Sequence, residues 1–279
     1  MTGDRRCSAW EWGADMSAIR MFQVDAFADQ VFAGNPAAVL VLDDWLPDRL
    51  MQSIAEENNL AETAFLRPAQ GGWDIRWFTP VHEAEFCGHA TVAAAHILCT
   101  ERGMSGDIAF FTRVGELQVR ASGKDYQLHM PRFEPEIMEE PPREVAHLFG
   151  DERIGQFKNF ENVFIELARE EAVRSFVPDL AAITRLFPMG LAITAAGAEA
   201  DFVSRYFAPG AGIPEDPVTG STHATLVPYW AGKLGKSRLS AVQCSARGGR
   251  LVCELEDGRV SVSGHAVTFM RAEIFLPAL

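Results

Sequence analysis

The sequence predicts an α+β fold made of two copies of one unit, each a mixed β-sheet with a few helices. The tract Arg-Trp-Phe-Thr-Pro at 76–80 returns as Arg-Tyr-Phe-Ala-Pro at 205–209. A loop rich in Gly and Thr follows each copy, at 88–91 and at 220–225, and each loop opens an apolar, Ala-containing run. Both matches occur in the same order with similar offsets, which indicates an ancient duplication.

Length and composition support two domains. The chain has 279 residues, of which 48% are hydrophobic, enough for two packed cores. We expect an N-terminal domain over 18–131 and a C-terminal domain over 132–264, with the Pro-rich, acidic segment 131–142 as the linker. Residues 1–17 show neither a helical nor a strand period and are predicted to form a loose tail.

The elements of the first half follow from apolar periodicity and from turn residues. Pro47 starts the first helix and Asn58-Asn59 ends it, whereas Gly103 stops the second, whose nearly continuous apolar sequence predicts burial. The expected strands cover 19–27, 37–42, 61–66, 73–78 and, as two or three strands, 108–130; the expected helices cover 47–58 and 91–102.

The second half is predicted to repeat this plan. Pro228 lies inside the last expected helix and should kink it. The expected helices cover 142–149 and 221–233; the expected strands cover 162–167, 189–194 and 201–207, followed by four short strands over 238–275 with turns at 247–249, 257–258 and 263–264.

Charge and cysteine usage exclude several classes of function. The net charge is −13 and the chain has no run of Lys and Arg, so a nucleic-acid partner is not expected. No apolar run reaches membrane-spanning length and no signal-like segment begins the chain, so we expect no membrane partner and a cytoplasmic location. Five scattered cysteines suit reduced thiols better than disulfides.

Glu62 is the first candidate for chemistry. Strand alternation over 60–66 places it on the same face as Leu60, Ala64 and Leu66. An apolar face disfavours the charged form of a carboxylate and suits it to hold and return a proton, as a general acid/base does. The alternative is an edge-strand Glu that reaches solvent or caps the preceding helix.

The two Gly-containing loops supply the other candidates. Unpaired amides and the positive dipole end make each helix start a site for a carboxylate or oxyanion. His89 follows Gly88 at the first start and can take part in proton transfer, unless its role is structural. Asp216 precedes Gly220 and Ser221 in the second loop, unless it is only a turn residue fixed by Pro217. Glu62, His89 and Asp216 are therefore predicted to line one cleft.

Thiol, metal and nucleotide chemistry are less well supported. Cys87 stands at a helix start, where thiol pKa values fall, but the second loop offers no cysteine for a two-thiol racemase. His82, Cys87, His89 and His96 match no familiar zinc spacing, so we expect no metal. The nucleotide-binding Gly motifs are absent from the sequence, so we expect no cofactor.

At these residues the chain resembles the PhzF-like (phenazine biosynthesis-like) isomerase family, which shares the diaminopimelate epimerase fold. The resemblance covers most of the chain after Met16. Four tracts carry it: 23–27 with 32–39, 59–65, 78–80 with 87–91, and 215–221.

The resemblance implies two pseudo-symmetric domains, each a sheet wrapped around a central helix, with residues after about His265 completing the first. It also implies a homodimer and a cofactor-free proton transfer between the domains. Glu62 matches the acid/base position, and His89 and Asp216 match the assisting and substrate-orienting positions. The substrate-binding positions of the family are matched by Gly88, Gly220 and Ser221.

The resulting functional hypothesis is a cofactor-independent isomerase that moves a proton on a small carboxylated metabolite. Two alternatives stay open. In one, Cys87 assists as one half of a racemase or epimerase. In the other, the protein binds a small acid or serves as a scaffold without turnover.

Overall fold

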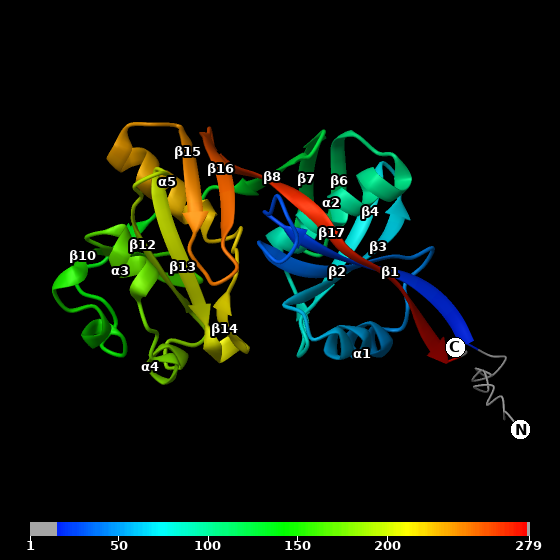
Figure 1. Ribbon diagram of the computed structural model, residues 1–279, viewed down its shortest axis with the longest axis horizontal. Coiled ribbons are helices and arrows are strands. Elements are labelled where there is room, and N and C mark those ends of the chain that lie inside the picture. Colours follow the sequence, from blue (N-terminus) through cyan, green and yellow to red (C-terminus); the bar gives the residue numbers. More distant parts are fainter. Residues whose placement is uncertain (1–15, 278–279) are drawn as a thin grey trace, which may run out of the picture.

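The computed structural model describes residues 16–277, and two halves stand side by side in it (Figure 1). The strands of the first half are β1 Met16–Ala26, β2 Asn35–Val41, β3 Glu62–Ala69, β4 Gly72–Phe78, β5 Glu83–Ala84, β6 Gly106–Thr112, β7 Gly115–Ser122 and β8 Asp125–Pro131. Its helices are α1 Asp48–Asn58 and α2 Gly88–Arg102.

The second half holds the remaining elements. Its strands are β9 Glu136–Ile137, β10 Arg153–Lys158, β11 Asn162–Leu167, β12 Gly190–Ala196, β13 Phe202–Ala208, β14 Ile213–Asp216, β15 Arg238–Gln243 and β16 Gly249–Glu256, and β17 Arg259–Pro277 ends the described chain. Its helices are α3 Glu170–Ser175, α4 Leu180–Thr184 and α5 His223–Leu234, with 3₁₀ turns at Ala146–Leu148, Gly150–Glu152 and Pro209–Ala211.

Strand pairing repeats in the same order in the two halves. In the first, β1–β2 is antiparallel, β2–β3 parallel, β3–β4 antiparallel, β4–β6 parallel, and β6–β7 and β7–β8 antiparallel. The second gives the same series over β10, β11, β12, β13, β15, β16 and β17. Even the short side strands β5 and β14 correspond, each antiparallel to its neighbour, so the duplication read from the tracts extends through the whole topology.

β17 connects the halves. Its first part pairs with β16 and β8, and from Ala266 onward it pairs with β1. The strands β1, β2, β3, β4, β6, β7, β8 and β17 therefore form a closed circuit around α2. Figure 1 shows β17, in red, leaving the half that holds β15 and β16 and running beside β1.

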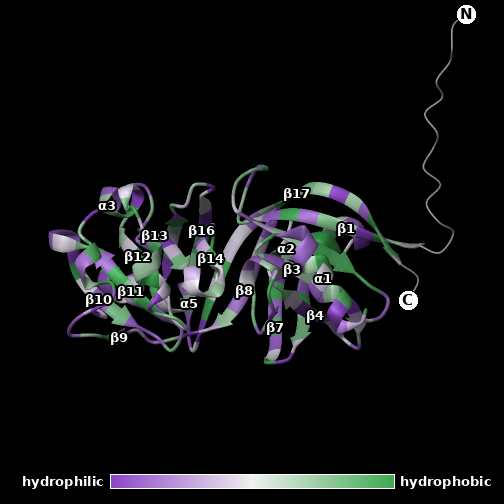
Figure 2. Cartoon of the chain, turned by 90° about the horizontal axis from the view of Figure 1, so that it is seen from below, coloured by the Kyte–Doolittle hydropathy of each residue, from purple (hydrophilic) through white to green (hydrophobic). Residues whose placement is uncertain are grey.

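The two central helices are the core of the fold. α2 packs against β1, β2, β3, β7, β8 and β17, and all of its residues from Gly88 to Leu98 are buried. α5 packs against β15, β16 and β17. One continuous hydrophobic cluster includes residues of both helices, such as Val92 and Trp230, so the halves share a core. Buried and exposed residues alternate along β7 and β8, whereas β11 is buried along its whole length. Figure 2 shows the hydropathy of these strands.

Helix ends follow the sequence signals closely. Pro47 precedes α1, and Asn59 ends it in the left-handed conformation. Gly103 and Gly235 end α2 and α5 in the same conformation, which glycine adopts without a steric penalty. α5 continues through the buried Pro228 to Leu234.

Several sequence predictions were wrong. The segment 142–149 forms only a 3₁₀ turn and not the predicted helix. The turn predicted at 263–264 is absent, because β17 runs without interruption through Gly264. Met16 and Ser17 belong to β1, so the predicted tail over 1–17 was too long, and residues 1–15 lie outside the described chain. Strand β10 and helices α3 and α4 were not predicted.

A pair of glycine substitutions tests the packing of the loop before β2. Gly34 and Gly71 both have positive φ, but a Cβ on Gly34 would lie 2.2 Å from the Ala26 carbonyl oxygen, whereas nothing lies within 4 Å of one on Gly71. We expect Gly34→Ala to lower the free energy of unfolding by about 3 kcal/mol or more and Gly71→Ala by about 1 kcal/mol. Urea denaturation measures both, and equal losses would contradict the clash.

Candidate active site

Glu62 opens β3 next to the N-terminus of α2. Its residue is 9% exposed, and Ala64 and Leu66 on the same strand face belong to the core cluster around α2. The predicted face is therefore correct for Ala64 and Leu66, whereas Leu60 precedes the strand and packs against the cluster that holds Phe65. Parallel pairing sets Glu62 beside Ala37 of β2, so the carboxylate lies among buried neighbours and not at a solvent-facing edge.

His89 is the direct partner of Glu62. It is the second residue of α2 and 4% exposed, and its Nε2 lies 3.1 Å from Glu62 Oε2. Its Nδ1 lies 3.1 Å from Asn35 Nδ2 and 3.5 Å from Cys87 Sγ. The imidazole thus stands between the carboxylate of β3 and an amide at the start of β2.

Asp216 reaches the same place from the second half. It ends β14 and is 7% exposed, and its Oδ1 accepts a 2.7 Å hydrogen bond from Asn35 Nδ2. Thr219 Oγ1 donates to its other carboxylate oxygen. Because Asn35 contacts both His89 and Asp216, one amide joins the catalytic candidates of the two halves.

Asn35 and Gln243 are site residues that sequence reasoning missed. Asn35 also donates to the Val218 carbonyl at 2.9 Å, and its Oδ1 has no hydrogen-bond partner among the described residues. Gln243 donates to the Asp216 carbonyl and accepts from the Thr219 amide, both at 2.8 Å. Both side chains are fully buried. Asn35 lies in a Gly-Asn-Pro turn, which explains its presence without any functional role, whereas nothing in the sequence marks Gln243.

The predicted substrate-binding residues bring the two helix starts together. A Cβ on Gly88 would lie 3.5 Å from Gly220 Cα, and one on Gly220 would lie 3.6 Å from Gly88 Cα. Neither glycine has positive φ, so their role is the close approach of two backbones. The positive ends of α2 and α5 thereby converge on one point, where a carboxylate or oxyanion is favoured.

Burial and neighbouring charges set the protonation of the site. Burial works against the imidazolium, but the neighbouring Cys87 sulfur and, after it, the Glu62 carboxylate raise the pKa of His89 well above its ordinary value. Cys87 adds to this only when ionised. Burial raises the pKa of Asp216 to about 6, opposed by the charge of His89 and supported by that of Glu62. Asp216 is therefore the group of this site that titrates not far from neutral pH.

Cys87 is unsuited to act as a thiolate. It caps α2 but is 5% exposed, and burial raises its pKa to about 11 despite the helix end. Glu62, Cys87 and His89 each offer a ligand atom within 4.8 Å of the others, which is the composition of a three-ligand metal group. A metal would need the ionised thiol and would compete with the pairing of Glu62 and His89, so the residues fit a metal poorly.

The other histidines considered with Cys87 have different partners. His82 Nδ1 lies 3.3 Å from Thr79 Oγ1, whereas His96 contacts Tyr126 Oη and Thr268 Oγ1 inside the first half. His223 corresponds to His89 in the repeated loop, yet its Nδ1 donates to the Thr219 carbonyl and its ring lies 5.8 Å from Phe202. The duplicated histidine is thus buried beside Phe202 of the shared core.

A groove of about 1020 Å³ lies beside the site. Phe86 and His129 of the first half and Phe133, Glu161 and Ser221 of the second half are among its lining residues. Glu62, His89 and Asp216 do not line it, but Phe86 and Ser221 immediately neighbour Cys87 and Gly220. Ser221, predicted to bind substrate, is therefore the candidate that faces open volume.

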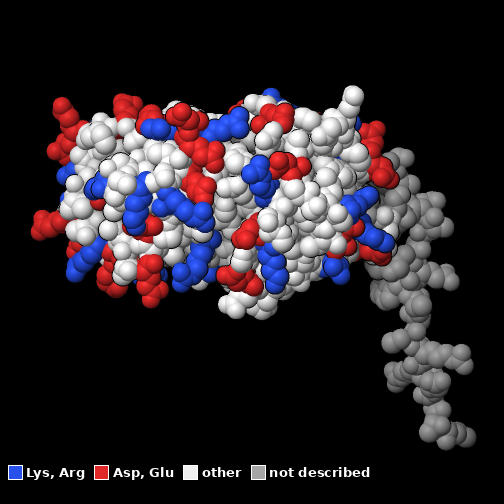
Figure 3. Space-filling view, turned by 90° about the horizontal axis from the view of Figure 1, so that it is seen from above, with Lys and Arg blue, Asp and Glu red and all other residues white. Residues whose placement is uncertain are grey.

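Surface charge is mixed on one face of the molecule. Lys and Arg side chains alternate with Asp and Glu on the face shown in Figure 3. Among the described residues, no helix combines the length and hydropathy that a membrane span requires.

Comparison with known proteins shows the family to which the chain belongs. The family profile described as phenazine biosynthesis-like protein (PhzC-PhzF) matches residues 24–272. An uncharacterized isomerase of Pseudomonas aeruginosa is 46% identical over 259 residues, covering 92% of this chain and 99% of the relative. The crystal structure of a PhzF-family phenazine biosynthesis protein from Enterococcus faecalis has a TM-score of 0.89 at 41% identity, covering 93% of this chain and 100% of that one.

The fold reaches beyond the family. A hydroxyproline epimerase from Agrobacterium vitis has a TM-score of 0.64 at 10% identity, covering 96% of this chain and 94% of that one. At this identity the likeness concerns the fold alone, and it confirms the predicted α+β, epimerase-like class.

The pKa of Asp216 predicts a pH dependence of stability. The folded protein holds the Asp216 proton up to about pH 6, whereas the ordinary value is 3.8. Between these values the native state binds more protons than the unfolded state, so this group makes stability fall as pH rises. We expect wild type to lose roughly 1–3 kcal/mol relative to Asp216→Asn between pH 4 and about pH 6.5. Chemical denaturation across this range measures the difference, and parallel profiles would contradict it.

Proposed function

The chain belongs to the phenazine biosynthesis-like (PhzC-PhzF) family and is an isomerase, and we propose that it moves a carbon-bound proton of a small carboxylated metabolite without a cofactor. Glu62 takes and returns this proton, and His89 and Asp216 assist. The observation that carries the proposal is the meeting of Glu62, His89 and Asp216, from three elements and both halves, at two converging helix starts.

Glu62 is suited to the proton transfer by its surroundings. Its Oε2 is buried and lies 3.1 Å from Nε2 of the His89 imidazole. In the forward step a Glu62 oxygen forms a bond to the proton as the substrate C–H bond breaks, and the electron pair stays on the substrate. The return step delivers the proton to the substrate at the position that defines the isomer.

The charge that develops on the substrate needs stabilisation where it forms. The backbones at the starts of α2 and α5 converge at Gly88 and Gly220, and amide donors held in place there favour the transition state over the ground state. The pKa of Asp216, raised to about 6 by burial, lets its carboxyl group accept or donate a hydrogen bond to a polar substrate group. Its contacts with Asn35 and Thr219 fix its direction.

The groove provides the remaining space. Ser221 lines it and stands next to Gly220, so its hydroxyl can hold a polar group of the substrate while the carboxylate lies at the helix ends. Aromatic side chains of the groove, including Phe86 and Phe133, suit a flat or cyclic body.

A role for Cys87 in proton transfer has no comparable support. Burial raises the pKa of the thiol to about 11, and residues 217–219 of the facing loop contain no cysteine. Binding of a small acid without turnover is distinguished from catalysis by the experiment below.

Proton NMR in deuterium oxide tests the proposal. Wild type is incubated with a panel of small cyclic and amino-acid carboxylates, and loss of a carbon-bound proton signal or appearance of an isomer is followed. We expect Glu62→Gln to slow exchange by about 10²–10⁴-fold, because the amide cannot accept the proton. Cys87→Ala is the matched control from the same cluster and is expected to keep activity within about threefold.

Three outcomes would oppose the proposal in different ways. A folded Glu62→Gln variant as fast as wild type would exclude Glu62 as the acid/base. Loss of exchange in Cys87→Ala alone would favour the thiol mechanism. Line broadening without exchange, equal in wild type and Glu62→Gln, would indicate a binding protein.

A further inference from the structure

The arginine of the repeated tract is not used by the proposed reaction, yet each copy makes a forked contact with a glutamate and lies over a phenylalanine ring. We propose that Arg205 with Glu215, and the corresponding Arg76 with Glu83, are positioning pairs that hold the strands β14 and β5 leading into the two loops of the site. This inference rests on the proposed function, because positioning matters only if the site is catalytic. The positions of the side chains can nevertheless be measured without a substrate.

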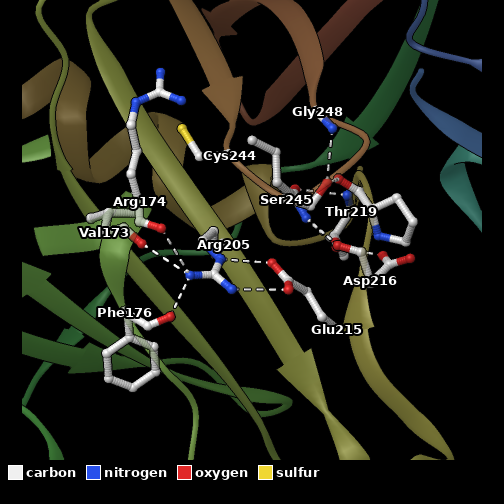
Figure 4. A network of polar contacts seen from close by, with 12 residues as sticks. Val173, Arg174, Phe176, Arg205, Glu215, Asp216, Thr219, Cys244, Ser245 and Gly248 are labelled. Carbon is white, nitrogen blue, oxygen red and sulfur yellow. Dashed lines mark hydrogen bonds and ion pairs between the residues drawn. The ribbon is translucent and has the colours of Figure 1, made fainter. Parts of the chain in front are cut away.

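The second-half pair is closely held (Figure 4). Arg205 Nε lies 2.7 Å from Glu215 Oε1, and Nη2 lies 2.9 Å from Oε2. The third nitrogen, Nη1, donates to the Phe176 carbonyl at 2.6 Å, and the guanidinium lies 5.0 Å from the Phe207 ring centroid. The Arg205 side chain is 9% exposed. Such a forked contact fixes the orientation of both partners as well as their separation.

The first-half pair repeats this geometry. Arg76 Nε lies 2.7 Å from Glu83 Oε1, and Nη2 lies 2.8 Å from Oε2. Its guanidinium lies 5.2 Å from the Phe78 ring centroid, two residues ahead as Phe207 is from Arg205. A forked glutamate and a stacked phenylalanine thus occur at equivalent places in both halves.

The two arginine–glutamate pairs occupy the same positions in the strand register, although the loops between the partners differ in length. Ala84 lies opposite Trp77, and Asp216 lies opposite Tyr206. In each case the glutamate directly precedes the opposed residue, and the arginine directly precedes the opposed aromatic. The separation along the chain is seven residues in the first pair and ten in the second.

The contact determines where Asp216 points. Side chains alternate along a strand, so a Glu215 held against Arg205 leaves Asp216 on the opposite side, towards Asn35. Glu83 likewise lies just before the loop that leads into α2, because Cys87 and His89 follow it within six residues. Each pair therefore acts through the loop next to it and does not touch the reacting atoms.

Side-chain amide exchange of Asn35 reports the position of Asp216. In the intact protein the Asn35 amide donates to Asp216 Oδ1 and to the Val218 carbonyl, so NMR should find its protons protected. Glu215→Ala removes the forked contact and keeps the bond from Arg205 to Phe176. We expect exchange of the Asn35 amide to accelerate by roughly five- to tenfold, with a smaller effect in Glu215→Gln, which keeps a neutral partner.

Asp74→Ala is the matched control. Asp74 on β4 pairs with Arg67 on β3 at 2.9 Å, so its removal also breaks a partly buried arginine contact between neighbouring strands, but away from the site. If the role of Glu215 is purely structural, the exchange rate of the Asn35 amide will depend only on the melting temperature of each variant. Equal Asn35 exchange in Glu215→Ala and Asp74→Ala at matched stability would overturn the proposal.

The first-half pair gives an independent arm. The Thr91 amide donates to the Cys87 carbonyl in the first turn of α2. Glu83→Ala is expected to accelerate exchange of the Thr91 amide several-fold while that of the Asn35 amide stays unchanged. A uniform response of both reporters to either variant would show general loosening and would count against positioning. Absence of proton transfer with every acid would refute the proposed reaction but leave these exchange results intact.

Discussion

The close approach of Gly88 and Gly220 is the constraint on which the rest of the molecule depends. Two helix starts with their positive ends together repel each other, and the two backbones meet so closely that a Cβ on either glycine would already be in van der Waals contact with the Cα of the other. Negative groups at the same point, Glu62 and Asp216, offset this repulsion. The fold therefore brings opposite charges together in a buried place between the two halves.

Asn35 shows how the halves are kept in register at that point. One amide group contacts Asp216, Val218 and His89, so a small relative shift of the halves would break several contacts together. On the same side, Arg247 of the second half donates to Asp25 and to the Gly34 carbonyl of the first. The geometry of the site is thus a property of the interface and not of either half alone.

The sequence was most informative where a local rule determines the structure. Alternation placed Glu62 on the strand face that carries Ala64 and Leu66, and Gly103 ended α2 as expected. It was least informative where residues far away in the sequence determine the structure. A strand as long as β17 needs two different neighbours along its length, which no short-range pattern near Gly264 can reveal. Likewise, the partners of Arg76 and Arg205 lie at different separations along the chain, so the repeat marked the arginines but not their glutamates.

β17 also has a consequence for how the protein is made. The ring of strands around α2 includes β1, from the beginning of the described chain, and β17, from its end. During synthesis the first half leaves the ribosome early but lacks the strand that joins β1 to β8. Its apolar helix stays incompletely enclosed until the last residues emerge, so ring closure must follow translation of the second half. An ancestral single unit would have needed its own closing strand. In the duplicated chain, the strand that closes the first half comes after the second half, so the first half cannot be completed without it.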